Sequence, residues 1–200
     1  MEKLLVHACC APCLCAIYED IENNLQEYNL ESKDSFDIIW YNVNIHPKVE
    51  YIHRMNTLKE FLQMKSKEGI FLDEYNLYNF VEGAIKYKDL GYLSRCEYCY
   101  TLRLEKVFEY AKQNGYTTVT TSLLISPYQK HDKIIAVCEK LSAKYGVKFL
   151  YKDYRPYFRP GQVRAKELGL YRQKFCGCIF SVDEAYGKCT DVERLYYEET

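Results

Sequence analysis

Residues 3–13 read KLLVHACCAPC, and this stretch predicts the fold because an apolar run ends in a cysteine-rich turn. Residues 3–8 have the length and apolar character of a short buried strand. Pro12 suits the first turn of a helix, where its missing N–H costs little, so residues 12–28 are predicted to be helical. A strand followed at once by a helix is the opening unit of an α/β sheet. The first cysteines are therefore expected at the strand-to-helix turn.

The chain then repeats this alternation. The further predicted strands are residues 36–44, 70–72, 117–121 and 147–151, and the further predicted helices are residues 47–67, 76–88, 96–114 and 129–145. After residue 151 the periodicity weakens into a basic, proline-containing segment and a short C-terminal part. The order indicates one α/β domain over residues 1–200, with a single doubly wound, mostly parallel sheet and helices on both faces.

Length and composition limit the class of protein. A chain of 200 residues can bury a core without the help of disulfides. The N-terminal apolar run is too short for a signal peptide, and no segment approaches the roughly 20 apolar residues of a membrane span. We therefore expect a soluble, cytoplasmic protein with no membrane partner. In that reducing compartment, the ten cysteines are expected to be reduced or bound to metal.

Six cysteines form three tight pairs in distant parts of the chain. They are Cys9 with Cys10, Cys96 with Cys99, and Cys176 with Cys178. The functional site of a doubly wound sheet lies beyond the carboxyl ends of its strands, which is where the first pair is expected. The second pair, three residues apart on the first turn of a helix, would share one face of that helix. The pairs are therefore predicted to converge on one metal or redox site.

The first two pairs favour an iron–sulfur cluster over zinc, because a cluster offers separate irons to adjacent cysteines. Their four thiolates would saturate the irons of one [4Fe–4S] cluster. A thioredoxin-like CxxC at residues 10–13 and a purely structural zinc module are competing interpretations. Cys15 and Cys138, inside predicted helices, are expected to be small apolar core residues.

The third pair has a single glycine between its thiols. A disulfide between Cys176 and Cys178 would close a small, strained ring and be easy to reduce, which suits a redox shuttle. The alternative is ligation of a second metal, with Cys13 as a possible extra ligand. The residues alone leave both roles open.

A basic segment, residues 148–174, stands out although the formal net charge of the chain is only −1. It holds eight basic residues against two acidic ones, interleaved with tyrosines and phenylalanines. Cations alternating with rings suit a phosphate backbone with unstacked bases, so RNA is a candidate partner. The competing interpretation is a solvated basic face above packed tyrosines. The chain has neither G-x-x-x-x-G-K-[ST] nor G-x-G-x-x-G, so no nucleotide cofactor is supported and electrons must come from an external donor.

Five motifs follow one another over nearly the whole chain. They are HACCAPC at residues 7–13, YNVNIHP at 41–47, RCEYCY at 95–100 with Arg103, TTSLLISPY at 120–128 and LYRQKFCGC at 170–178. Together they resemble the epoxyqueuosine reductase family QueH. The resemblance implies an adenine nucleotide α-hydrolase-like, Rossmann-like fold. It also implies reduction of epoxyqueuosine at the tRNA wobble position to queuosine, the last step of queuosine synthesis, without cobalamin.

The resemblance also implies roles for the cysteines. It places the [4Fe–4S] cluster on Cys9, Cys10, Cys96 and Cys99 and makes Cys176 and Cys178 a redox-active pair. An additional, mononuclear iron beside the cluster is implied as well, with ligands from the same cysteines. Loss of an epoxide oxygen as water needs two electrons and two protons, whereas a cluster commonly passes one electron at a time. The dithiol or the second iron would therefore complete the electron count, and the iron could polarise the epoxide oxygen.

Two sets of residues are candidates for the remaining roles. The proton donor is expected among Tyr128, Tyr171 and His7. The phosphate contacts are expected at Arg159, Arg164, Lys166 and Arg172. The competing functions are a zinc-stabilised RNA-binding module and a thiol–disulfide oxidoreductase.

Overall fold

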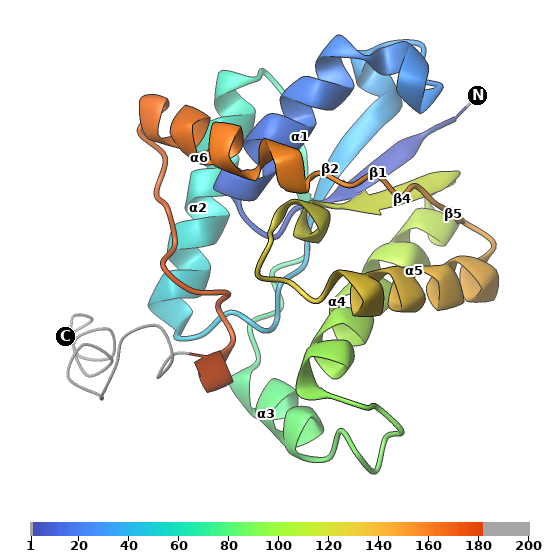
Figure 1. The fold of residues 1–200 in the computed structure, drawn as a ribbon, viewed down its shortest axis with the longest axis vertical. Coiled ribbons are helices and arrows are strands. Elements are labelled where there is room, and N and C mark those ends of the chain that lie inside the picture. Colours follow the sequence, from blue (N-terminus) through green and yellow to red (C-terminus); the bar gives the residue numbers. More distant parts are fainter. Residues whose placement is uncertain (1, 182–200) are drawn as a thin grey trace.

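The computed structural model describes residues 2–181 and contains a five-stranded sheet flanked by helices (Figure 1). The strands are β1 (Leu4–His7), β2 (Phe36–Trp40), β3 (Gly69–Phe71), β4 (Thr118–Thr121) and β5 (Lys148–Phe149). They are all parallel, in the order β3-β2-β1-β4-β5. The predicted doubly wound, Rossmann-like α/β fold is confirmed.

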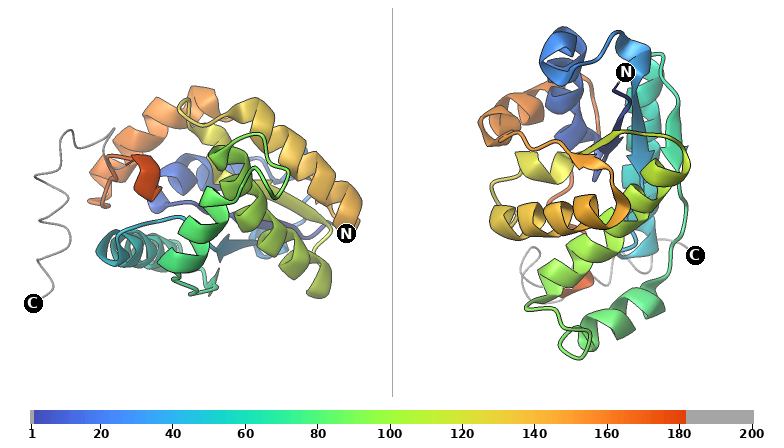
Figure 2. Two further views of the ribbon diagram at one scale, coloured as in Figure 1. Left: turned by 90° about the horizontal axis from the view of Figure 1, so that it is seen from below. Right: turned by 90° about the vertical axis from the view of Figure 1, so that its right-hand side faces the viewer.

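Helices lie on both sides of this sheet (Figure 2). They are α1 (Ala11–Asn23), α2 (Lys48–Met64), α3 (Leu77–Ile85), α4 (Arg95–Gln113), α5 (His131–Tyr145) and α6 (Phe158–Glu167). Short 3₁₀ helices occupy Leu25–Tyr28, Lys33–Ser35, Ser122–Ile125, Arg155–Tyr157 and Ile179–Ser181. α1 packs against α2 and α6, and α4 packs against α5. Among residues 2–181, none of the helices combines the length and apolar character of a membrane span.

The register of the sheet brings three strand ends together. His7, the last residue of β1, lies opposite Ile39 of β2 and Thr121 of β4. All four residues of β1 are buried, as expected for the central strand of a parallel sheet covered on both faces. The segments that follow β1, β2 and β4 therefore leave the sheet side by side.

The structure departs from the predicted elements at two places that bear on the site. β2 ends at Trp40 instead of continuing to residue 44, because the following residues turn towards the cysteine-bearing segments. Asn42, in that turn, donates from its amide to the carbonyl oxygen of Ala8 at 2.9 Å. After β2 ends, the Asn42 side chain therefore provides the hydrogen bond to the backbone after β1 that further strand pairing would have provided.

α6 was not predicted, since Pro160 and Gly161 interrupt the helical pattern. Pro160 lies in the first turn, where its missing N–H costs no intrahelical bond. Gly161 faces α1 so closely that an added Cβ would lie 3.2 Å from the Cβ of Ala16. The two residues that obscure the helix in the sequence therefore serve its start and its docking beside α1 (Figure 1).

A small second core positions α4 next to the main one. It contains Tyr41 and Val43 after β2, Phe80 of α3, and Tyr98 and Cys99 of α4. α3 approaches this cluster through Gly83, where an added Cβ would lie 1.9 Å from the Tyr98 hydroxyl. Packing thus fixes the start of α4, which carries the second cysteine pair.

Candidate metal and redox site

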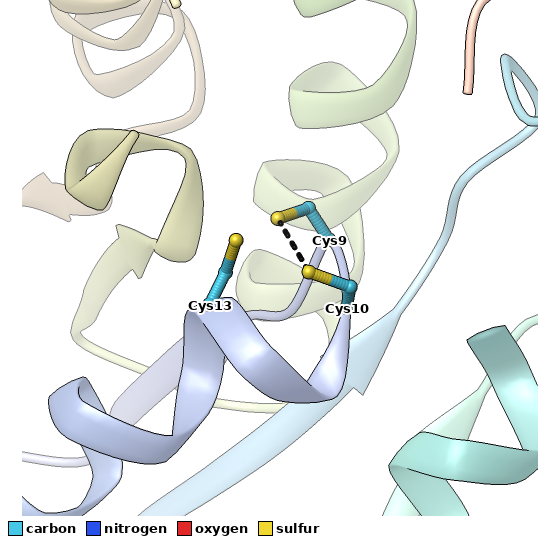
Figure 3. Close-up of side chains that lie close together, drawn as sticks. All are labelled: Cys9, Cys10 and Cys13. Atoms are coloured by element: carbon cyan, nitrogen blue, oxygen red, sulfur yellow. Dashed lines mark hydrogen bonds between the residues drawn. The ribbon is translucent and has the colours of Figure 1, made fainter. Parts of the chain in front are cut away.

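The N-terminal cysteine turn, residues 9–13, gathers three thiols. Cys9 is half-buried and Cys10 and Cys13 are buried, and their sulfur atoms all lie within 4.8 Å of one another. The Cys9 and Cys10 sulfurs are 3.7 Å apart. Figure 3 shows the three side chains converging from the turn before α1 and from its first helical turn. Among residues 2–181, no other group of three His, Cys, Asp or Glu side chains meets the same criterion.

The sheet edge holds Cys9 in place. Because β1 and β4 are neighbours, Ser122 directly follows β4 beside the N-terminal cysteine turn. Its hydroxyl oxygen accepts from the Cys9 backbone N–H at 2.9 Å and donates to the Cys9 sulfur at 3.2 Å. This contact confirms that the first cysteine pair lies at the carboxyl edge of the sheet.

The surroundings of the three thiols separate their pKa values. Hydrogen bonds from the Cys10 and Cys13 thiols lower the pKa of Cys9, and the Ser122 hydroxyl adds to this. Burial raises the pKa of Cys10, whereas the neighbouring Cys10 and Cys9 thiols raise that of Cys13. Cys10 is the N-cap residue of α1, so the positive end of the helix dipole lies beside this cysteine. One anionic sulfur is thus favoured in the turn.

This donor set fits a thiophilic metal. Around a tetrahedral ion with metal–sulfur bonds of about 2.3 Å, two neighbouring sulfurs lie about 3.8 Å apart. The 3.7 Å between Cys9 and Cys10 matches that spacing. Soft thiolate ligands select zinc, copper(I) or iron–sulfur centres over hard cations. The turn can therefore hold a metal ion with cysteine ligands.

The second predicted pair lies at the start of α4. Ser94 caps this helix by accepting from the Glu97 backbone N–H at 3.3 Å. Cys96 is half-buried and Cys99 is buried; burial raises the pKa of Cys99 to about 11. Neither thiol belongs to the compact group of three.

Arg103 joins the second pair to the N-terminal cysteine turn. Its Nε donates to the Cys99 carbonyl at 3.4 Å, and its other end donates to the Asn42 side-chain oxygen at 3.2 Å. Since Asn42 in turn donates to Ala8, the two cysteine-bearing segments are connected through one buried guanidinium.

The C-terminal cysteine turn, residues 176–178, approaches from a third direction. Both of its cysteines are free thiols, with Cys176 exposed and Cys178 half-buried. Gly177 has φ +96°, and its carbonyl accepts from the His46 backbone N–H at 2.8 Å. A hydrogen bond from the Cys178 thiol lowers the pKa of Cys176. Exposure and a favoured thiolate are features of reactive cysteines.

A buried ion pair that the sequence did not reveal supports this turn. Arg54 donates to the Glu50 carboxylate at 2.6 Å and to the Phe175 carbonyl at 2.9 Å. Tyr171 donates from its hydroxyl to the other Glu50 oxygen at 2.6 Å. The i, i+4 spacing of Glu50 and Arg54 on α2 is common on exposed helix faces, so spacing alone could not mark this pair as buried.

Gln173 was also missed as a functional residue. Its Nε2 donates to the Cys10 sulfur at 2.7 Å and lies 3.9 Å from the Cys13 sulfur. Its Oε1 is buried without a hydrogen-bond partner among the described residues. Position in the fifth motif was the available signal for Gln173, and position directly after a predicted strand was the signal for Ser122.

The three candidate proton donors have different surroundings. His7 is fully buried; its ring donates to the Tyr41 carbonyl and its other nitrogen accepts from the Thr121 hydroxyl. Burial lowers the pKa of His7 to about 4. Tyr171 already donates to Glu50, and Tyr128 is 83% exposed, with its ring against Phe158. The neutral, doubly bonded His7 is the least suited of the three.

The predicted phosphate contacts fall into two groups. Arg164 pairs with Glu19 at 3.0 Å and Glu167 at 3.3 Å. Within residues 2–181, ion pairs to Arg159, Lys166 and Arg172 are not found, and all three are exposed. The second group therefore offers the more available cations.

Comparison with known proteins covers the same range of residues. A model of the family described as "Epoxyqueuosine reductase QueH" matches residues 4–184. A protein of that name from Dehalococcoides mccartyi is 33% identical over 186 residues, which cover 93% of this chain and 96% of that protein. One from Thermotoga maritima is 31% identical over 200 residues, covering 97% of each chain. One from Haemophilus influenzae is 32% identical and covers 98% of this chain and 80% of that protein.

Proposed function

The chain belongs to the epoxyqueuosine reductase QueH family, and we propose that it reduces epoxyqueuosine at the tRNA wobble position to queuosine, the last step of queuosine synthesis. One observation carries this function: the family match spans residues 4–184. The three thiols of Cys9, Cys10 and Cys13, close together at the carboxyl edge of the sheet, support it. A tRNA substrate and reduced thiols both fit a cytoplasmic location.

The reaction sets a fixed demand for electrons and protons. Both carbon–oxygen bonds of the epoxide break, a carbon–carbon double bond forms, and the oxygen leaves as water. Two electrons and two protons enter for each oxygen removed. The electrons come from an external reductant, and no cobalamin or nucleotide takes part in this proposal.

The cysteine-bearing segments would hold the metal centre. We assign Cys9, Cys10, Cys96 and Cys99 as ligands of a [4Fe–4S] cluster, which when bound supplies electrons one at a time. Cys13 lies close enough to the first pair to be an extra ligand, for a second, mononuclear iron. The Ser122 and Gln173 hydrogen bonds to Cys9 and Cys10 orient those sulfurs and restrain their charge.

The C-terminal cysteine turn is suited to complete the electron count. A dithiol can do so because oxidation of the Cys176 and Cys178 thiols to a disulfide releases up to two electrons and two protons, and the external reductant then returns the disulfide to thiols. Cys176 is exposed and can meet a bound substrate, whereas the buried Arg54 holds the preceding carbonyl in place. The competing role of this pair is ligation of the second iron.

The exposed basic residues would hold the RNA. Arg159 and Lys166 lie on α6, which packs against the cysteine-bearing helix α1, and Arg172 precedes the C-terminal cysteine turn by four residues. Phosphate contacts release counterions, so tRNA binding should weaken as salt rises. Arg164, with two carboxylate partners, should contribute less than the other three.

Turnover of the natural substrate tests the function. The chain is purified without oxygen and incubated with dithionite and tRNA that carries epoxyqueuosine, with no cobalamin or nucleotide added. Mass analysis of the digested nucleosides should show loss of one oxygen. An unmodified substrate after incubation with protein of full iron and sulfide content would refute the proposal.

A zinc-stabilised RNA-binding module is the second candidate, because three thiols within 4.8 Å also suit a single ion. Metal analysis of the purified chain separates the two functions. Iron with inorganic sulfide supports the reductase, whereas zinc without sulfide supports the module. A thiol–disulfide oxidoreductase, which the exposed Cys176 would suit, should instead reduce protein disulfides and leave epoxyqueuosine unchanged.

A further inference from the structure

Arg103 is a buried cation whose hydrogen-bond and ring partners among residues 2–181 are all neutral. Its side chain is 4% exposed and lies one turn after Cys99 on α4. The guanidinium donates to the Cys99 carbonyl and to the Asn42 amide oxygen, and it lies 5.9 Å from the Tyr100 ring centroid. None of these groups carries a compensating negative charge.

The other buried arginine of this region is paired. Arg54, 3% exposed, lies 2.6 Å from the Glu50 carboxylate. Within residues 2–181, no carboxylate lies within the 4.0 Å ion-pair distance of Arg103. A buried charge without a partner costs several kcal/mol, so an anion is expected close to Arg103.

The hydrogen bonds of Arg103 tie it to the segments that carry the candidate metal ligands. Its hydrogen bonds place the guanidinium between the segments that carry Cys99 and Cys9, with Asn42 as the link. Arg103 therefore links two segments that carry candidate ligands of the centre.

We propose that Arg103 is the counter-cation of the metal–thiolate centre, a positioning residue whose buried charge is balanced when thiolates bind metal. A centre with four thiolate ligands keeps a net negative charge with zinc or with a [4Fe–4S] cluster. The negative charge of the centre therefore offsets the positive charge that Arg103 brings into the core. This inference rests on the proposed function only in requiring a metal centre on Cys9 and Cys99.

The first test measures the reduction potential of the loaded protein. In Arg103→Met the potential should become more negative, because an added electron is no longer stabilised by a nearby cation. Arg103→Lys keeps the charge and should recover most of the shift. An Arg155→Met variant, whose arginine pairs with Asp153 on the surface, should leave the potential unchanged. Equal potentials for wild type and Arg103→Met at full iron content would overturn the inference.

The second test compares melting temperatures with and without metal. Arg103→Met should melt at the same or a higher temperature than wild type in the metal-free chain, because it removes an unbalanced buried charge. With metal bound it should melt lower, and its metal affinity should fall about 10–100-fold. Arg54→Met should melt lower in both states, because it leaves Glu50 unpaired. If Arg103→Met lowers the melting temperature of the metal-free chain as much as Arg54→Met does, Arg103 is merely structural.

Each proposal can fail by itself. Wild-type protein that loads iron but leaves epoxyqueuosine tRNA unchanged would refute the reductase function, whereas the two Arg103 measurements would still decide the inference. If the chain carries zinc instead of iron, the melting comparison and the zinc affinity decide it. Wild-type turnover together with an unchanged potential in Arg103→Met would remove the inference and leave the function standing.

Discussion

The N-terminal and C-terminal cysteine turns bring thiols to one region but are held differently. Residues 9–13 lie between a buried strand and its helix, and backbone and Ser122 contacts fix Cys9. Residues 176–178 come after β5 and α6 and depend on the His46 N–H and the Arg54 side chain. The first turn directly continues a strand of the sheet, whereas the second is held against the rest of the domain by hydrogen bonds from other segments.

This difference in support suggests a division of labour. Metal ligands must be held precisely, which favours rigid elements of the fold. A thiol pair that exchanges electrons with a substrate needs access, and Cys176 is exposed whereas Cys10 and Cys13 are buried. The predictions below separate metal retention from turnover in these two turns.

The largest effect is expected when Cys9 is replaced. Cys9→Ala removes the half-buried sulfur that Ser122 orients, so the centre should lose iron and sulfide. Because loss of groups that only support metal ligands costs 10–100-fold, loss of a ligand should lower turnover by more than about 100-fold. Iron content and nucleoside mass analysis are the measurements.

Cys138→Ala is the matched control for this change. Cys138 is fully buried in α5 and packs in the main core without a place in the three-thiol group. Its replacement should retain iron and sulfide even if stability falls. Equal metal loss in both variants would mean that the Cys9 effect arises from unfolding.

Replacing Cys176 should differ from replacing Cys9 in the metal that the protein retains. In Cys176→Ala, turnover should fall strongly while the [4Fe–4S] cluster stays bound, because this thiol lies on the C-terminal cysteine turn and not on the sheet edge. Loss of about one iron per chain would instead identify a second metal site. Disappearance of all iron and sulfide would show that the two turns form one indivisible centre.

A smaller effect should follow from Gly177→Ala. At φ +96° an added Cβ would lie 2.9 Å from Ile45 Cγ1 and 3.1 Å from an Arg54 nitrogen. The strained backbone should cost about 1–3 kcal/mol, lower turnover and leave the iron content unchanged. Gly115→Ala is the control, because Gly115 also has positive φ (+72°) but no neighbour within 4 Å. Equal loss of turnover in both would remove the close contact as the cause.

The sequence predicted the sheet and the placement of Cys9 and Cys10, because strand-to-helix order alone places the end of β1 at the carboxyl edge. It did not predict α6, whose helical period is interrupted by Pro160 and Gly161. Nor did it predict the roles of Arg54 and Arg103, because the meaning of each depends on which charges lie nearby after folding. Local sequence patterns are enough to predict helices and strands, whereas the partners of a buried charge depend on tertiary contacts.

The finest comparison uses two serines, each of which contacts one of the two turns. Ser122 is fully buried and both accepts from the Cys9 N–H and donates to its sulfur. Ser181 donates to the Cys178 carbonyl at 2.8 Å and lies 2.9 Å from the Cys176 sulfur in a half-buried position. Ser122→Ala leaves a buried N–H unpaired and should cost about 1–3 kcal/mol, whereas water can replace the Ser181 hydroxyl, so Ser181→Ala should cost at most about 1 kcal/mol. Denaturant unfolding measures both, and an equal or larger loss for Ser181→Ala would show that the C-terminal cysteine turn is as firmly built into the fold as the N-terminal one.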